Sequence, residues 1–282
     1  MSRFGRLNYT NRHKRWIGRI LGSINWAKLV FFGLVGGTIL VVGLFWWFSR
    51  DLPDPNEIQR KKGFSPQILD RKDETVLFDV YDEENRLFTP LNDIPQALRQ
   101  GTIAVEDKDF YKHQGFDLLG IVRGFTRIFT SGRAEGGSTL TQQLVKNVLL
   151  TNERSLARKI KELVLAVQIE RRFSKDEVLQ MYLNEAPYGG TAWGIAAAAE
   201  QYFGKKPTEL DLTQSIILAG MPQAPSKYSP YGKNPLAYVA RASAVARRMR
   251  EDGYITRDQE KDVVSRLPSV SFRPTGSSIK AP

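Results

Sequence analysis

An uninterrupted apolar run near the N-terminus places the strongest constraint on this chain. Residues 29–48, LVFFGLVGGTILVVGLFWWF, contain no charged side chain over 20 positions. At about 1.5 Å per residue, a helix of this length covers the ~30 Å hydrocarbon layer of a bilayer. A cleaved signal peptide is the alternative, but the apolar segment is longer than a signal-peptide core and WFSRDLPDP offers no small-residue cleavage site. The run therefore predicts one transmembrane helix.

The distribution of charge predicts the orientation of that helix. Residues 1–28 carry seven basic residues and no acid, whereas Asp51, Asp54 and Glu57 follow the apolar run. Because Lys and Arg favour the cytoplasmic side, we expect a basic cytoplasmic tail, a single pass through the cytoplasmic membrane and an extracellular or periplasmic remainder. The net charge is +11, but removing the seven basic residues of the tail leaves 34 basic against 30 acidic residues. A nucleic-acid-binding function is therefore the weakest interpretation of the charge.

The region after the apolar run divides into a stalk, a domain and a tail. Residues 49–65 are rich in proline and charge, which fits a short stalk. Two β-prone segments flank the polar residues 70–74 and predict a small hairpin. Helical signals dominate from about residue 93 onward. The sequence thus predicts a mainly α domain over 66–262 and a polar tail over 263–282.

Several helix boundaries can be predicted from capping residues. Ser174 with Glu177, and Thr256 with Gln259, form capping boxes. Asn234 and Pro235 predict a further helix start, and Gly253 predicts its end.

Composition removes several kinds of chemistry. The chain has no cysteine and only two histidines, His13 and His113. Thiol catalysis, disulfides, Cys-based zinc sites and polyhistidine metal centres are thereby excluded, and no metal site is predicted.

The stretch AVEDKDFYKHQGFD combines acids, a rare histidine and aromatic residues. On a continuous helix, Glu106, Phe110, His113 and Asp117 fall at i, i+4, i+7 and i+11 and share one face, with Asp107 pointing elsewhere. An ordinary helix, in which Glu106 faces solvent and His113 makes a local hydrogen bond, is the simpler interpretation of this stretch alone. A catalytic interpretation needs converging features from other segments.

Two later segments supply such features. GGSTLTQQLVKN (136–147) is a glycine-led helix start that can present N–H groups to an anion, although an ordinary capped polar helix fits equally well. In RSLARKIKELVLAVQIERRFS, Glu162 stands where a basic segment becomes apolar, and Arg158 with Glu162 also suits a plain i, i+4 ion pair. Residues 120–175 hold 11 basic against 4 acidic residues, so we expect an anionic ligand near these helices.

Together with SKDEVLQMYLN and SKYSPYGKNPLAYVARASAVARRM, these segments resemble the five motifs of the glycosyltransferase family 51 module, in the same order and spacing. That module occurs in class A penicillin-binding proteins and monofunctional peptidoglycan glycosyltransferases. The resemblance extends over residues 53–255. It implies a lysozyme-like, mainly α fold with two lobes, a head and a jaw at 115–133 that dips into the membrane. Ordinary core packing is the alternative explanation of the apolar residues at 115–133.

The resemblance also implies an activity and roles for individual residues. Members of the family polymerise lipid II into β-1,4-linked glycan strands with inversion and release of undecaprenyl diphosphate. Glu106 matches the general base, and Glu162 matches a second carboxylate on the diphosphate side. The remaining matched residues are expected to bind substrate or support the site: Asp107, Phe110, His113, Thr139, Gln143, Lys146, Asn147, Arg158, Lys159, Tyr182, Asn184 and Tyr188.

The expected partners are lipid II, the growing lipid-linked glycan chain and the cytoplasmic membrane, and the resemblance admits other cell-wall synthesis proteins. No cofactor is required, although the family admits a divalent cation, Mg or Mn. SFRPTGSSIKAP resembles the start of a linker to a transpeptidase domain. Ser277 and Lys280 form an SxxK pair, which we treat as chance because only two residues follow.

Two other functions stay open at this point. A lysozyme-like fold also suits a lytic enzyme that cleaves peptidoglycan, but the basic RKIKE segment has no obvious use in such a reaction. A non-catalytic membrane-anchored scaffold, in which the charged motifs build only ion pairs, is the other alternative.

Overall fold

The computed structural model describes residues 26–48, 50, 52, 67–69, 76–79, 85–117, 137–150 and 155–274. The chain divides into two compact units, Met1–Asp51 and Leu52–Pro282. In the first unit, helix α2 (Trp26–Phe48) covers the predicted membrane segment, and large apolar side chains such as Phe31 and Phe32 are exposed on it. Across the described ranges, no helix is long and apolar enough to span a membrane.

The second unit is mainly helical, as predicted, and begins with a small hairpin. Strand β1 (Gln67–Leu69) pairs antiparallel with β2 (Val76–Asp79), with Ile68 opposite Phe78. The hairpin expected around residues 70–74 is therefore confirmed.

A second small sheet was not predicted. Strand β3 (Asn85–Arg86) lies parallel to β5 (Ala192–Trp193), and β4 (Pro187–Gly189) pairs antiparallel with β5. Strands of two or three residues are too short to show an alternating pattern in the sequence. The sheet brings the start of the domain against the segment that follows helix α7 (Lys175–Glu185).

The helices of this unit are α3 (Gln96–Glu106), α5 (Leu140–Val148), α6 (Leu156–Arg172), α7 (Lys175–Glu185), α8 (Ile195–Phe203), α9 (Leu212–Gly220), α10 (Pro225–Tyr228), α11 (Ala237–Glu251) and α12 (Arg257–Arg266). Short 3-10 helices occur at η2 (Leu91–Asp93), η3 (Pro207–Glu209), η4 (Met221–Gln223) and η5 (Leu267–Ser269).

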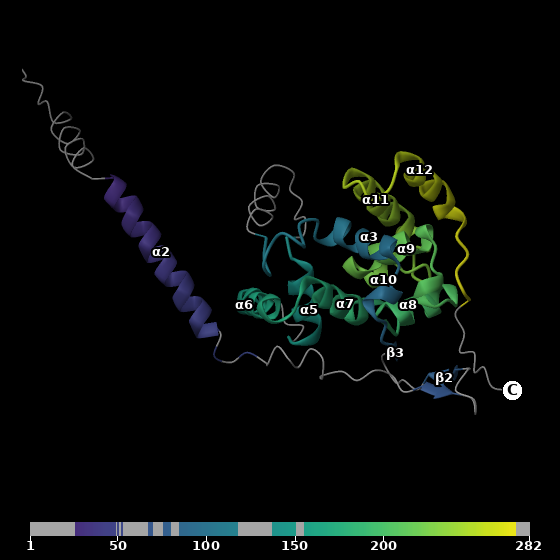
Figure 1. Ribbon diagram of the computed structural model, residues 1–282, viewed down its shortest axis with the longest axis horizontal. Helices are drawn as coiled ribbons and strands as arrows, with labels where there is room; N and C mark the ends of the chain where they lie inside the picture. Colours follow the sequence, from purple (N-terminus) through teal and green to yellow (C-terminus); the bar gives the residue numbers. More distant parts are fainter. Residues whose placement is uncertain are drawn as a thin grey trace, which may run out of the picture. The chain divides into compact units, whose positions relative to one another are not determined.

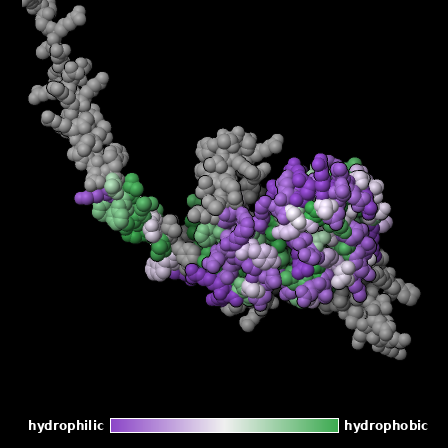
Figure 2. Space-filling model, turned by 45° about the horizontal axis from the view of Figure 1, so that its top comes forward, coloured by the Kyte–Doolittle hydropathy of each residue, from purple (hydrophilic) through white to green (hydrophobic). Residues whose placement is uncertain are grey.

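Two groups of helices make up the domain. Helices α3, α9 and α11 pack against one another, and α12 packs on α11; helices α5, α6 and α7 form the other group (Figure 1). Helix α8 contacts both α7 and α9, and one continuous apolar core runs through both groups. Hydrophilic residues cover most of the visible face of this unit (Figure 2). Most of the predicted jaw (115–133) lies outside the described residues, which stop at 117 and resume at 137.

The capping predictions can be compared with the observed helix ends. The capping boxes at Ser174 and Thr256 are both present, and Gly253 follows α11 with φ +78°. The predicted helix start at Asn234 and Pro235 is wrong by two residues, because α11 begins at Ala237. The side chain of Asn234 instead accepts a hydrogen bond from Leu236 N at 3.3 Å, which makes a turn before the helix.

Gly194 is required by close packing as well as by its backbone conformation. It precedes α8 with φ +82° and ψ 163°, and a Cβ there would lie 2.4 Å from the carbonyl oxygen of Asn184. This region of backbone conformation is almost restricted to glycine. Gly253 has a similar φ of +78°, but a Cβ there would meet nothing within 4 Å.

We expect Gly194→Ala to lower the free energy of unfolding by about 3 kcal/mol, since it adds a steric clash to a conformational penalty. Gly253→Ala, the matched control, should lose only about 1 kcal/mol because it carries the conformational penalty alone. Chemical denaturation followed by circular dichroism measures both values. Equal losses would show that the contact with Asn184 has no energetic weight.

Candidate active site

Glu106 is the last residue of α3, and its carboxylate is held by two other helices. The side chain is 8% exposed. Oε2 accepts a hydrogen bond from Gln143 Nε2 of α5 at 2.9 Å, and Oε1 accepts one from an Arg241 guanidinium nitrogen of α11 at 2.5 Å. Because both donors sit on helices, the carboxylate has a fixed orientation at the meeting point of the two helix groups.

A buried tyrosine fixes the amide of Gln143. The hydroxyl of Tyr182 donates to Gln143 Oε1 at 3.3 Å, so Nε2 is the amide atom that faces Glu106. Burial raises the pKa of Tyr182 well above its ordinary value, and the negative charge of Glu106 raises it further. Tyr182 therefore stays neutral and keeps its proton as a donor to Gln143.

Arg241 was not assigned a role from the sequence, although it lies in the last quoted motif. Its Nε donates to Gly220 O at 3.1 Å, which leaves the other end of the guanidinium for Glu106. A Cβ at Gly220 would lie 3.0 Å from Arg241 Cγ, so the glycine leaves room for the arginine stem. No local spacing could have linked positions 106 and 241, because they meet only through the packing of α3 on α11.

Two further contacts join the C-terminal end of α11 to the residues on either side of Glu106. Arg248 donates to the carbonyl oxygen of Val105 at 3.2 Å, and Lys108 forms an ion pair with Asp252. A cation beside the free carbonyls of a helix C-terminus is electrostatically favourable. The turn that carries Glu106 is thus anchored on both sides of the carboxylate.

The predicted shared helix face of Glu106, Phe110, His113 and Asp117 is wrong. Helix α3 ends at Glu106, and residues 107–117 form turns. Asp107 leaves the helical conformation because its carboxylate accepts a hydrogen bond from Leu140 N, the first residue of α5, at 2.9 Å. Helical periodicity cannot reveal this contact, which joins residues 33 positions apart.

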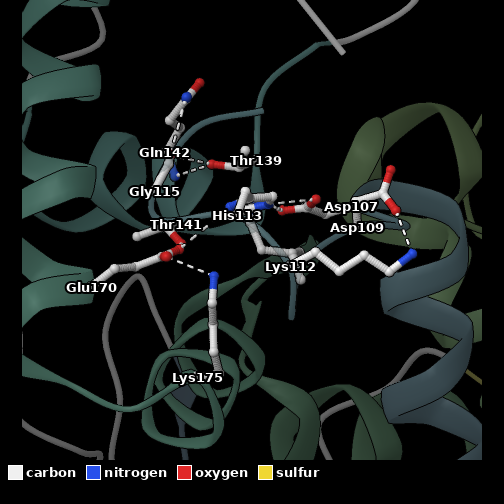
Figure 3. A network of polar contacts seen from close by, with 11 residues as sticks. Asp107, Asp109, Lys112, His113, Gly115, Thr139, Thr141, Gln142, Glu170 and Lys175 are labelled. Atoms are coloured by element: carbon white, nitrogen blue, oxygen red, sulfur yellow. Dashed lines mark hydrogen bonds and ion pairs between the residues drawn. The ribbon is translucent and has the colours of Figure 1, made fainter. Parts of the chain in front are cut away.

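Asp107, His113 and Phe110 nevertheless stabilise the turn that follows Glu106. His113 Nε2 lies 2.9 Å and 3.0 Å from the two carboxylate oxygens of Asp107 (Figure 3). Phe110 is fully buried and meets the His113 ring edge to face. Asp107 is thus engaged in holding α5, and these residues stabilise the turn rather than contact Glu106 directly.

A second buried carboxylate, Glu162 on α6, is surrounded by cations. Its side chain is 3% exposed, and Lys159 Nζ lies 2.9 Å from Oε2. Arg158 Nε lies 3.3 Å from Oε1 without hydrogen-bond geometry, so Oε1 has no hydrogen bond within the described residues. Lys159 also donates to Ser138 Oγ at 2.7 Å and to Gln142 Oε1 at 3.1 Å.

Lys146 of α5 interacts electrostatically with both carboxylates. Burial lowers its pKa, and the positive charges of Arg158 and Lys159 lower it further, whereas Glu162 and Glu106 act in the opposite direction. The side chains of Lys146 and Asn147 make no hydrogen bond in the part of the chain that the structure describes. Helix α5 therefore contributes a partly buried ammonium group that is attracted by both the predicted base and the predicted second carboxylate.

Three of the predicted site residues are engaged in the protein interior. Thr139 caps α5, accepting from Gln142 N at 3.3 Å, and donates to Gly115 O at 2.9 Å. Asn184 binds both the N–H and the carbonyl of Thr89, at 2.7 and 2.8 Å. Tyr188 is fully buried, its pKa is raised by burial, and its hydroxyl has no hydrogen-bond partner among the described residues. The side-chain polar groups of Thr139 and Asn184 are used in these internal hydrogen bonds. Both residues therefore stabilise the fold around the site rather than bind a substrate.

The described residues contain no group of three or more His, Asp and Glu side chains that could hold a metal ion.

Comparison with known proteins identifies what the chain resembles. A sequence model of the family described as Transglycosylase matches residues 73–250. Penicillin-binding protein 1A of Rickettsia bellii is 44% identical over 249 residues, which cover 87% of this chain and 31% of that protein. Penicillin-binding protein 1A of Aquifex aeolicus is 38% identical over 248 residues, which cover 85% and 33%. The chain therefore spans about a third of the length of these curated relatives.

Among solved structures, penicillin-binding protein 1A from Haemophilus influenzae aligns with a TM-score of 0.41 at 23% identity, over 72% of this chain and 21% of that chain. An alignment at this level does not establish a shared fold.

The lowered pKa of Lys146 predicts that its positive charge destabilises the folded protein. A lysine with a lowered pKa binds its proton less tightly when folded, so stability is reduced below that pKa and recovers as the pH rises toward the ordinary value near 10.5. We therefore expect Lys146→Met to raise the melting temperature at neutral pH.

Lys108→Met is the matched control with the opposite expected sign. The pKa of Lys108 is raised by its hydrogen bond and ion pair with Asp252, so removal of the ammonium group should lower the melting temperature at neutral pH. Thermal unfolding by circular dichroism measures both variants. A lower melting temperature for Lys146→Met would mean that its ammonium is paired rather than merely buried.

Proposed function

The chain belongs to the transglycosylase family, and from this we propose that it is a peptidoglycan glycosyltransferase that polymerises lipid II into β-1,4-linked glycan strands. The observation that carries the proposal is the pair of buried carboxylates, Glu106 and Glu162, both of which attract the ammonium of Lys146. One carboxylate suits proton transfer, and the cations around the other suit a diphosphate.

Glu106 is proposed as the general base. Its carboxylate takes the proton of the acceptor sugar's 4-hydroxyl while that oxygen attacks the anomeric carbon of the donor. The bond from the anomeric carbon to the diphosphate oxygen breaks, the electron pair leaves with undecaprenyl diphosphate, and the configuration inverts. Gln143 and Arg241 support this role because their hydrogen bonds fix the orientation of the carboxylate.

The basic residues are proposed to stabilise the leaving group. Negative charge grows on the diphosphate as its bond to the sugar breaks, and fixed cations nearby lower the energy of that transition state. Lys146, Arg158 and Lys159 supply three cations around Glu162. No cofactor is needed for this reaction, because the cations around Glu162 supply the positive charge that the leaving group requires.

The proposed activity also distinguishes the chain from a lytic enzyme. Cleavage of a glycan polymer releases no diphosphate, so it gives no reason to gather cations around Glu162. A non-catalytic scaffold gives no reason to hold Glu106 by two donors from different helices.

Glu106→Gln removes the proposed base and keeps the shape of the side chain. We expect polymerisation of labelled lipid II to fall by about 10³-fold or more, because a general base contributes roughly 10²–10⁴ and an amide cannot accept the proton. The variant should still fold and bind lipid II, although its melting temperature should fall because Arg241 loses its charged partner.

Glu251→Gln serves as the control because Glu251 is exposed and forms only surface ion pairs with Arg247 and Arg250. It should polymerise lipid II at the parental rate. A parent protein that solubilises cell-wall sacculi and makes no polymer from lipid II would establish the lytic alternative. Full activity of Glu106→Gln would remove this residue from the mechanism.

We further propose that residues 29–48 anchor the chain in the cytoplasmic membrane, with a lysozyme-like head and a jaw at 115–133 facing the outer side. Support comes from the sequence, in which the apolar run carries no charge and the preceding basic tail carries no acid. Arg123, Arg127 and Arg133 interleave with Leu, Ile and Phe in the jaw segment, as in an interfacial element. The growing glycan chain, the membrane and other cell-wall synthesis proteins are the partners that this location favours.

The absence of cysteine makes this topology directly testable. In intact cells, Ser269→Cys should react with a membrane-impermeant maleimide, because Ser269 is exposed and proposed to lie outside. Ser2→Cys should react only after the cells are lysed. Equal labelling of both variants in intact cells would contradict the proposed anchor.

A further inference from the structure

A further buried carboxylate, Glu170 near the end of α6, lies outside the proposed chemistry. Its side chain is 2% exposed. The hydroxyl of Thr141 on α5 donates to Oε1, and Lys175 Nζ at the start of α7 lies 2.6 Å from Oε2 (Figure 3). The ammonium of Lys175 also sits 4.5 Å from the centre of the Phe110 ring. Glu170 thus joins three helices at one point.

His113 connects this carboxylate to the turn that follows Glu106. Its Nδ1 lies 4.0 Å from Glu170 Oε1, and its Nε2 faces the carboxylate of Asp107 at 2.9 Å. An ionised carboxylate can only accept, so Nε2 carries the proton and donates it to Asp107. Nδ1 has no hydrogen-bond partner in the described part of the chain. The imidazole is therefore held between two carboxylates from different segments.

The two carboxylates hold the first turn of α5 at consecutive residues. Asp107 accepts from Leu140 N at 2.9 Å, and Glu170 accepts from the hydroxyl of Thr141. The same helix carries Gln143, the donor to Glu106, and Lys146, two and five residues beyond Thr141. A shift of this first turn would move both the amide and the ammonium relative to the proposed base.

We propose that Glu170 and Lys175 are positioning residues that keep α5 in register with Glu106. This inference rests on the proposed function. Lys175 compensates the charge of Glu170, and Glu170 in turn fixes Thr141 by a hydrogen bond and lies 4.0 Å from Nδ1 of His113. Displacement of a catalytic group by about 1 Å can cost about 10²-fold in rate, so this remote network can control turnover.

The test uses Glu170→Gln and Lys175→Met in the full-length chain. Glutamine keeps an acceptor for Thr141 but loses the charge, and methionine keeps an apolar stem over Phe110. In each variant we expect kcat for lipid II polymerisation to fall by about 10- to 100-fold, with KM changed by less than about twofold. The double variant should lose no more than the worse single variant, because both changes break the same network.

Glu260→Gln is the matched control, since Glu260 is also a mostly buried carboxylate, 20% exposed, paired with Arg250 at 2.5 Å. It should keep kcat even if it lowers the melting temperature. Parental kcat in folded Glu170→Gln and Lys175→Met would overturn the inference. If Glu170→Gln fails to fold, Lys175→Met decides alone, because its side chain is 22% exposed and the change is milder.

A second measurement separates this inference from the proposed function. With only two histidines in the chain, His13→Gln leaves His113 as the single source of imidazole nitrogen signals in NMR. We expect a slowly exchanging proton on Nε2 in the parent and faster exchange in Glu170→Gln, with no change in Glu260→Gln. A parent that makes no polymer would refute the proposed function, whereas unchanged exchange in Glu170→Gln would refute the positioning network.

Discussion

The way in which the C-terminal end of α3 is held determines the rest of the site. Glu106 is the last helical residue, where the backbone presents free carbonyls and an anion is unfavourably placed. Helix α11 offsets this with Arg241 on the carboxylate and Arg248 on the carbonyl of Val105. From the opposite side, α5 supplies Gln143 to the carboxylate. The two helix groups of the domain are therefore joined through the residue proposed to carry out proton transfer.

Buried carboxylates are costly unless they are paired, and Glu106, Glu162 and Glu170 are each compensated in a different way. Glu106 has Arg241 and an amide, Glu162 has Arg158 and Lys159, and Glu170 has Lys175. Arg158 and Lys159 already exceed the single charge of Glu162, and Lys146 adds a third cation. This local excess of positive charge is the electrostatic feature that a diphosphate would complement.

Sequence patterns predicted what is local and missed what depends on packing. The capping boxes at Ser174 and Thr256 and the hairpin before the helices are short-range features, and the structure confirms them. The motif resemblance selected Glu106 and Glu162, and in the structure both carboxylates are buried and paired with cations. Arg241 was missed because its partner lies 135 residues away. The continuous helix through residue 117 was wrong because the tertiary bond from Leu140 N to Asp107 competes with helical continuation.

Helix α5 explains why one short element can serve both halves of the proposed reaction. Gln143 and Lys146 stand at i and i+3, so they project from neighbouring positions of one rigid helix. The amide fixes the proposed base, while the ammonium interacts electrostatically with Glu162 and with Glu106. A rigid-body shift of α5 would therefore disturb proton transfer and leaving-group stabilisation together, whereas independent loops would allow each to change alone. This coupling gives a physical reason for the two hydrogen bonds that hold the first turn of α5. Leu140 N donates to the carboxylate of Asp107, and the Thr141 hydroxyl donates to that of Glu170.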